Sequence, residues 1–134
     1  MYEKFGQFIN GKWQNSSGNE TYEVINPATE EVLGKASKAN KKDIQLALKS
    51  AEKGLEVWKN TSPWERSKII RKISDLIRKK KDILSKWLTL EVGKPISEAP
   101  GEVGGAADIF EWNSEETKRI FGETNQSRFS NTRI

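Results

Sequence analysis

The residue types in this sequence limit the chemistry that the chain can do. Its 134 residues include no histidine and no cysteine. A Ser–His–Asp triad, a Cys–His pair and a histidine-ligated metal are therefore excluded within it. The sequence also lacks a Walker A motif, and no G-x-G-x-x-G motif follows a predicted strand. Taken alone, these residues indicate an α+β segment that is not an autonomous enzyme.

Carboxylates are the remaining candidates for chemistry. Glu91 ends an apolar helical segment beside Val92 and Gly93, where a carboxylate needs a partner or a cation. The alternative for Glu91 is an acid in water at the end of a helix. Six other acids are spread by their periodicity around one helix, so we expect them to be solvated; they are Glu98, Glu102, Asp108, Glu111, Glu115 and Glu116.

The longest element that must position these groups runs from Ser62 to Pro95. Ser62 followed by Pro63 and Glu65 predicts a capping box with proline at the first helical position. Apolar residues then recur at spacings of three and four as far as Leu88, which predicts one long helix, or two helices meeting near Lys81 and Asp82. We expect this stripe to be buried, and the chain supplies only part of what would cover it.

The N-terminal part of the sequence predicts two hairpins and a helix. Asn-Gly within Phe8–Trp13 is typical of a tight type I′ turn. Strands at Tyr22–Ile25 and Glu31–Ala36 flank a turn at Asn26–Thr29. Asn40 is the expected N-cap of an amphipathic helix whose apolar face is Ile44, Leu48, Ala51, Leu55 and Trp58.

A third helical region follows the Gly93-Lys94-Pro95 stop signal and ends before Gly122. Its predicted apolar face is Val103, Ala107, Phe110, Ser114, Thr117 and Phe121. Glycines in its first half, including Gly101 and Gly105, make the helix narrow, so a partner backbone or a ligand could approach closely there.

Composition narrows the classes of partner. The net charge is +4, from 23 Lys and Arg against 19 Asp and Glu. We interpret the basic run Arg78–Lys81 as a solvated helix face, because no aromatic residue is interleaved with it to stack on bases, and we expect no nucleic-acid partner. No apolar run is long enough to cross a membrane and no secretory signal is recognised. With no cysteine, these features predict a cytoplasmic protein.

Six segments, in this order, resemble the front of the aldehyde dehydrogenase superfamily. They are F-I-N-G-K-W (Phe8–Trp13), V-I-N-P-A-T-E-E-V-L-G (Val24–Gly34), the segment ending in Val57-Trp58, P-W-E-R-S-K-I-I (Pro63–Ile70), L-E-V-G-K-P (Leu90–Pro95) and F-E-W-N-S-E-E-T-K-R-I-F-G-E-T (Phe110–Thr124). The last segment is most similar to succinate-semialdehyde dehydrogenases. The resemblance spans nearly the whole chain but only about the first quarter of a family member.

The resemblance implies an α/β enzyme of which this chain is an α+β fragment, with two N-terminal hairpins followed by three amphipathic helical segments. Residues 1–124 would form the N-terminal part of the cofactor-binding domain, and residues 125–134 the truncated start of an oligomerisation hairpin. The family oxidises aldehydes with NAD or NADP, using a cysteine thiolate and a glutamate-activated water. The resemblance places those groups, the oxyanion Asn and the cofactor-phosphate loop beyond Ile134, so we expect the chain alone to be inactive.

The resemblance also assigns five residues of this chain. Glu91 matches an acid that helps hold a structural monovalent cation in some members, and the backbone carbonyls of Val24 and Ile25 match its other ligands in this region. Gly101 and Gly105 match positions bordering the substrate tunnel. The implied partners are an aldehyde, the missing remainder of the chain and further copies in a homo-oligomer.

Two other hypotheses stay open at the level of sequence. One is a stand-alone helical interaction module derived from this segment, which would bind a partner through its apolar faces. The other is a basic surface that binds nucleic acid or acidic lipid, with a steep dependence on salt.

Overall fold

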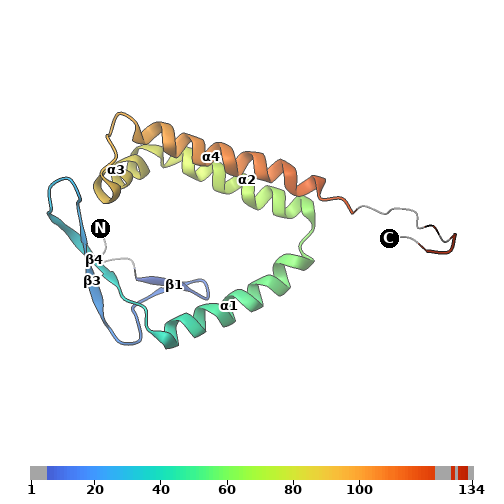
Figure 1. Cartoon of the computed structure of the whole chain (residues 1–134), viewed down its shortest axis with the longest axis horizontal. Helices are drawn as coiled ribbons and strands as arrows, with labels where there is room; N and C mark the ends of the chain where they lie inside the picture. The colour runs from blue at the N-terminus through green and yellow to red at the C-terminus, as the bar shows by residue number, and fades with distance from the viewer. Residues whose placement is uncertain (1–5, 123–127, 129, 133–134) are drawn as a thin grey trace.

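A computed structural model describes residues 6–122, 128 and 130–132. Two β-hairpins come first, and helices make up the rest of the described chain (Figure 1). The helices are α1 (Lys41–Asn60), α2 (Pro63–Lys79), α3 (Lys81–Val92) and α4 (Ala99–Glu116), followed by the short 3-10 helix η2 (Thr117–Arg119). This α+β architecture confirms the predicted fold class of the fragment. Of the helices described, none is long and apolar enough to cross a membrane.

The first hairpin pairs β1 (Gln7–Ile9) with β2 (Lys12–Gln14) in antiparallel register. Asn10 and Gly11 both have positive φ, at 54° and 75°, which is the conformation of a type I′ turn. The aromatic rings of Phe8 and Trp13 face each other across the strands with centroids 5.2 Å apart. The Asn-Gly prediction is confirmed.

The second hairpin pairs β3 (Thr21–Ile25) with β4 (Val32–Ser37), and its sheet is separate from the first. The predicted strands are confirmed, with ends shifted by one residue. In the turn, the Asn26 side-chain oxygen accepts a hydrogen bond from the Ala28 N–H at 2.9 Å. A register shift between Val24 and Ile25 interrupts the regular pairing of the two strands. The backbone carbonyl groups there therefore point in other directions than in a regular strand.

A capping box starts α1. The side chain of Asn40 accepts hydrogen bonds from the N–H groups of Lys42 and Asp43, and the Asp43 carboxylate accepts one from the Asn40 N–H at 3.0 Å. The same carboxylate accepts the Ser17 N–H at 3.0 Å, so it fastens the preceding loop to the helix. By contrast, every residue from 51 to 60 is exposed.

The predicted segment from Ser62 to Pro95 forms two helices. Ser62 caps α2 by accepting the Glu65 N–H, but the Glu65 carboxylate meets the Ser62 hydroxyl rather than its backbone N–H. The capping box is therefore only half formed. At Lys80 the backbone turns to φ −101° and ψ 14°, which separates α2 from α3. The two-helix alternative is confirmed, with the junction one residue before Lys81.

Helices α2 and α4 lie side by side along most of their length (Figure 1). Their contact is made of small residues that are buried, namely Ser67 and Ser74 on α2 and Val103, Ala107 and Ser114 on α4. The Ser74 hydroxyl donates a hydrogen bond to the carbonyl oxygen of Ala107 at 2.8 Å. Three larger apolar side chains of α2, those of Ile69, Ile73 and Leu76, stay exposed beside this contact.

The described residues cover the apolar stripe of α2 and α3 only in part, as expected from the sequence: Ile77, Leu84, Trp87 and Leu88 are half-buried. Ile69, Ile73 and Leu76 are 37–48% exposed. On α4, Phe110 and Phe121 of the predicted apolar face are also exposed, although Val103, Ala107, Ser114 and Thr117 are buried as predicted. Among the residues that the structure describes, the buried apolar residues are only Ile9, Ala99, Val103 and Ala107, while 23 large apolar side chains are exposed. The physical reason is that nothing described packs on these faces.

Candidate functional site

The C-terminal end of α3 lies against the turn of the second hairpin. Gly93 caps α3 with φ +76°, and a Cβ placed on it would lie 3.1 Å from the Cγ of Pro27. Ile25 and Glu91 each lie two residues before these contact points. The fold thus brings the segments of the three predicted cation ligands, Val24, Ile25 and Glu91, into one region.

The donors in this region fit a hard cation. The Glu91 side chain is exposed and makes no hydrogen bond or ion pair with any residue that the structure describes. Carboxylate and backbone carbonyl oxygens are the ligands that alkali and alkaline-earth ions prefer. No group of three or more His, Cys, Asp or Glu suited to a metal occurs in the described part of the chain. A site here would rely on carbonyl oxygens as well as Glu91.

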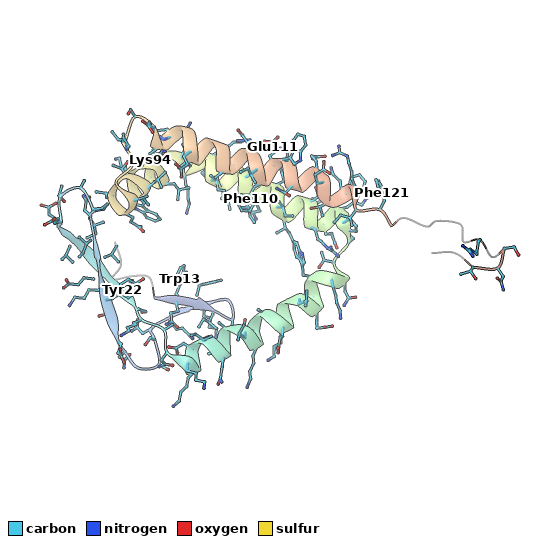
Figure 2. The ribbon with its side chains drawn as sticks, in the orientation of Figure 1. Trp13, Tyr22, Lys94, Phe110, Glu111 and Phe121 are labelled. Carbon is cyan, nitrogen blue, oxygen red and sulfur yellow. The ribbon has the colours of Figure 1, made fainter. Side chains whose placement is uncertain are left out.

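Lys94 joins the segment after α3 to α4 through two ion pairs. Its Nζ lies 2.9 Å from the Glu102 carboxylate and 3.6 Å from that of Glu98. The hydrogen bond to Glu102 raises the pKa of the Lys94 ammonium, and the charge of Glu98 adds to the effect. Figure 2 shows Lys94 at this end of α4 and Glu111 further along the same helix. The ion pairs fix the α3–α4 connection next to Gly93.

An apolar groove of about 430 Å³ lies between α2, α3 and α4. Ile77, Trp87 and Val103 contribute to its walls, with Glu91 and Glu102 among its polar residues. Gly101 and Gly105 do not line it. Helical periodicity places both glycines on the face of α4 opposite Val103 and Ala107, where a Cβ on either would meet no atom within 4 Å. They belong to an open surface of this chain.

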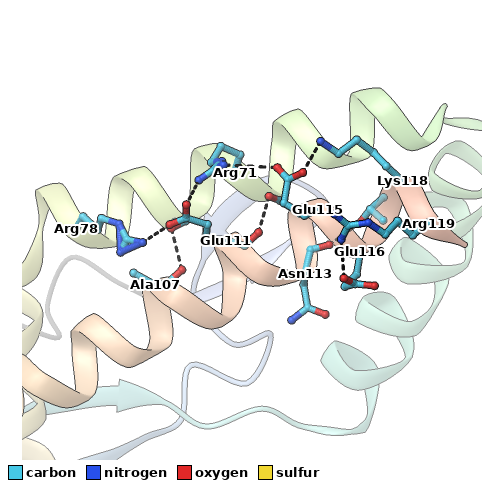
Figure 3. A network of polar contacts seen from close by, with 12 residues as sticks. Arg71, Arg78, Ala107, Glu111, Asn113, Glu115, Glu116, Lys118 and Arg119 are labelled. Atoms are coloured by element: carbon cyan, nitrogen blue, oxygen red, sulfur yellow. Dashed lines mark hydrogen bonds and ion pairs between the residues drawn. The ribbon is translucent and has the colours of Figure 1, made fainter.

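A ladder of ion pairs joins α2 to α4 on one side of the helix pair (Figure 3). Glu111 accepts hydrogen bonds from both Arg71 and Arg78, and Arg78 also pairs with Asp108 at 3.0 Å. Arg71 first, then Arg78, hold the pKa of the Glu111 carboxyl below its usual value. Lys118 lowers the pKa of Glu115 in the same way. This network fixes the register of the two helices.

This ladder was not predicted from the sequence. All six acids expected to be merely solvated form ion pairs, namely Glu98, Glu102, Asp108, Glu111, Glu115 and Glu116. Arg78, from the basic run, is part of the ladder and is not purely solvated. Two spacings in the sequence could have predicted the ladder. Arg71 and Arg78 are seven residues apart on one helix, and the acids of the later helix are three and four residues apart. Side chains at these spacings lie on one face of a helix.

A dinucleotide cofactor does not fit the described residues. Its phosphates bind where a glycine-rich turn leads from a strand to the free N–H groups at a helix start. The junction from β4 to α1 has no glycine, and the side chains of Asn40 and Asp43 occupy the backbone N–H groups there. The Asp43 carboxylate would also repel phosphate.

Comparison with known proteins identifies the class. Residues 13–134 match the profile of the Aldehyde dehydrogenase family, so the chain belongs to that family. Among curated relatives, it is 39% identical over 117 residues to glutarate-semialdehyde dehydrogenase of Pseudomonas putida, and 38% identical over 116 residues to an NADP(+) succinate-semialdehyde dehydrogenase of Escherichia coli. Each alignment covers 87% of this chain and 24% of the relative. The chain thus spans about a quarter of the length of these relatives.

Solved structures agree with this assignment. The chain superposes with a TM-score of 0.88 on a succinate-semialdehyde dehydrogenase from Burkholderia pseudomallei, at 38% identity. An NADP-dependent enzyme from E. coli gives 0.89 at 36% identity. Both matches cover 93% of this chain and 26% of the solved chain. The resemblance inferred from the sequence motifs, including the likeness to succinate-semialdehyde dehydrogenases, is confirmed.

Proposed function

We propose that this chain is the N-terminal part of an NAD(P)-dependent aldehyde dehydrogenase that oxidises a semialdehyde, an aldehyde that carries a carboxyl group at its other end. The observation that carries the proposal is the match of 93% of this chain, at a TM-score of 0.88, to about a quarter of a succinate-semialdehyde dehydrogenase. The curated relatives named for succinate and glutarate semialdehydes point to the same substrate class.

In this proposal the chain is a supporting part of the enzyme. Residues 1–124 belong to the cofactor-binding domain, and residues 125–134 begin an oligomerisation hairpin; of that last segment, 125–127, 129 and 133–134 lie outside the described residues. The sequence holds no cysteine to act as the thiolate nucleophile, so the chain alone is inactive. The complete enzyme is a cytoplasmic homo-oligomer that takes its cofactor through residues not present here.

Two sites of this chain serve the complete enzyme. The Glu91 carboxylate and the backbone carbonyls of Val24 and Ile25 hold a structural monovalent cation, which ties the end of α3 to the second hairpin. Gly101 and Gly105 border the substrate tunnel on the open face of α4. Support comes from the contact between Gly93 and Pro27 and from the free space around both glycines.

A chimera tests the proposed function. Residues 13–134 replace the aligned segment of the E. coli succinate-semialdehyde dehydrogenase, and NADP+ reduction is followed with succinic and glutaric semialdehydes. We expect reduction that depends on the semialdehyde. Circular dichroism and size-exclusion chromatography report whether the chimera folds and assembles. A folded, assembled chimera that oxidises neither semialdehyde would refute the proposal.

A further inference from the structure

Helix α1 is fastened to the rest of the described chain near its two ends. At its start, the Asp43 carboxylate accepts the Ser17 N–H at 3.0 Å. In its second half, every residue from 51 to 60 is exposed. Figure 1 shows that α1 and α2 meet at an angle, with a short connection between them. The contacts at this connection therefore decide how α1 lies relative to α2.

Arg66, in the first turn of α2, reaches back to the end of α1. Its Nε donates to the carbonyl oxygen of Thr61 at 2.8 Å, and its Nη2 donates to that of Lys59 at 3.0 Å. The guanidinium carbon also lies 5.8 Å from the centroid of the Trp58 ring. The guanidinium is planar and rigid and attracts an aromatic face. These contacts therefore fix the rotation of one helix against the other as well as their separation.

The sequence at the connection explains why the end of α1 needs an outside donor. In a continuing helix, the carbonyl oxygen of Lys59 would accept the N–H of the residue four positions later. That residue is Pro63, which has no N–H. The Thr61 carbonyl oxygen lies at the C-cap of α1, where carbonyl groups have no partner within the helix. The Arg66 guanidinium supplies the missing donors, and its charge stabilises the negative end of the helix dipole.

A change of angle at this connection would be amplified along α1. The helix has 20 residues, so it is about 30 Å long, and a rotation of about 10° at one end would move the other end by about 5 Å. That other end leads to the hairpins. The turn of the second hairpin meets the end of α3, where a Cβ on Gly93 would lie 3.1 Å from the Cγ of Pro27. A displacement of that size would break this contact.

We infer that Arg66 is a positioning residue, which sets the angle between α1 and α2 and, through α1, holds the second hairpin against the end of α3. The segments that carry the proposed cation ligands meet at that contact. Arg66 therefore also positions the cation site from the opposite end of α1, and this consequence rests on the proposed function.

Pulsed electron paramagnetic resonance between two spin labels measures both relationships in the 134-residue chain. The sequence has no cysteine, so labels attach only where cysteines are introduced. Lys49→Cys with Lys72→Cys spans the angle between α1 and α2. Glu31→Cys with Ser97→Cys spans the contact between the hairpin and the end of α3, and all four positions are exposed. We expect a single narrow distance distribution for each pair in the parent chain, and Arg66→Met should broaden both.

Two further variants separate the guanidinium contacts from a general loss of charge. Arg66→Lys keeps a positive charge beside Trp58 but lacks the planar fork that reaches two carbonyl groups, so it should broaden the distributions less than Arg66→Met does. Arg119→Met is the matched control, because it removes an arginine whose ion pair is with Glu116, three residues before it. Its distances should stay those of the parent. Circular dichroism of each labelled chain checks that the helices are retained.

An unchanged distribution across the angle in a folded Arg66→Met chain would overturn the inference. A parent chain whose distribution is already broad, or equal broadening by Arg119→Met, would also overturn it. If Arg66→Met loses its helices, the comparison of Arg66→Lys with Arg119→Met is read in the same way.

The consequence for the cation site is measured in the chimera as the stabilisation by KCl over choline chloride. Arg66→Met should reduce this stabilisation, and equal stabilisation of parent and variant would show that Arg66 does not position the site. No stabilisation in the parent chimera would count against the proposed cation site. An inactive folded chimera would count against the proposed function, while the distances in the 134-residue chain would still test the role of Arg66.

Discussion

Ser74 on α2 and Ala107 on α4 touch through a hydrogen bond of 2.8 Å between the Ser74 hydroxyl and the Ala107 carbonyl oxygen, and both residues are fully buried. A side chain reaches a backbone carbonyl in this way only where two helices approach closely. The flanking residues Ser67, Val103 and Ser114 keep the approach close. The helix pair is therefore held by small residues and a polar contact, while Ile69, Ile73 and Leu76 of α2 stay exposed.

Substitution at Ser74 tests this close approach. Ser74→Ala removes one buried hydrogen bond and should lower the free energy of unfolding by about 0.5–1.5 kcal/mol. Ser74→Leu forces the helices apart and should cost about 1–3 kcal/mol. Urea denaturation measures both, with the exposed Ser97→Ala as a control expected to change little. A Ser74→Leu chain as stable as the wild type would contradict the packing.

Replacement of Gly93 and of Gly54 by alanine should change the stability of the chain in opposite directions. Gly93 has φ +76°, and a Cβ there would crowd Pro27, so Gly93→Ala should destabilise the chain by about 1–2 kcal/mol. Gly54 lies inside α1 with open space around it, so Gly54→Ala should stabilise the helix by about 0.5–1 kcal/mol. Thermal melts followed by circular dichroism compare the two. If both substitutions shifted the melting temperature equally, α3 would not end against the hairpin.

The free energy of unfolding should depend on pH through the Asp43 carboxylate. Hydrogen bonds from the N–H of Asn40, and then from that of Ser17, hold the pKa of the Asp43 carboxyl below its usual 3.8. Its stabilising contribution is therefore complete above that value and is lost as the pH falls through the lower pKa of the folded state. Asp43→Asn should lose most of this acid dependence in urea denaturation between about pH 5 and pH 2. Parallel curves for the two proteins would refute the assignment.

The proposed cation site predicts a specific effect of potassium or sodium. In the chimera, KCl or NaCl should raise the melting temperature above that in choline chloride of equal ionic strength, because an ion that binds only the folded state stabilises it. Glu91→Gln should remove the difference. Glu98→Gln changes a neighbouring acid that pairs with Lys94 and should retain it. If both variants respond like the parent, Glu91 is not a ligand.

The proposed tunnel position predicts a change in specificity without a change in fold. Gly105→Leu has open space in this chain, so the isolated chain should keep its circular dichroism spectrum. In the chimera, the added side chain should lower kcat/KM for glutaric semialdehyde by about tenfold or more, and for the shorter succinic semialdehyde by less. An unchanged ratio between the two substrates would place Gly105 outside the tunnel.

Much of the local structure could be predicted from the sequence because it is set by nearby residues. Asn10-Gly11 fixes the first turn through its positive φ values, and Asn40 and Ser62 fix two helix starts through their side-chain oxygens. The junction at Lys80 was harder to predict, since no proline or glycine marks it and the apolar periodicity continues across it.

What the sequence did not predict depends on contacts between distant elements. The apolar stripe was expected to be buried, but which residues lie against α4 was not predicted: Ser67 and Ser74 are buried there while Ile69 and Ile73 are exposed, because periodicity identifies an apolar face without identifying what covers it. The ladder from Arg71 and Arg78 to Glu111 depends on the orientation of two helices, because the paired residues are 40 and 33 positions apart in the sequence. For the site residues, the motifs suggested roles for Glu91 and Gly105, while their surroundings came only from the fold.

The uncovered second half of α1 bears on the fate of the chain in a cell. Amides in residues 51–60 are protected by the helix's own hydrogen bonds, which open at low free energy where a helix is exposed along its length. A protease can therefore cut this stretch while the rest of the chain stays folded.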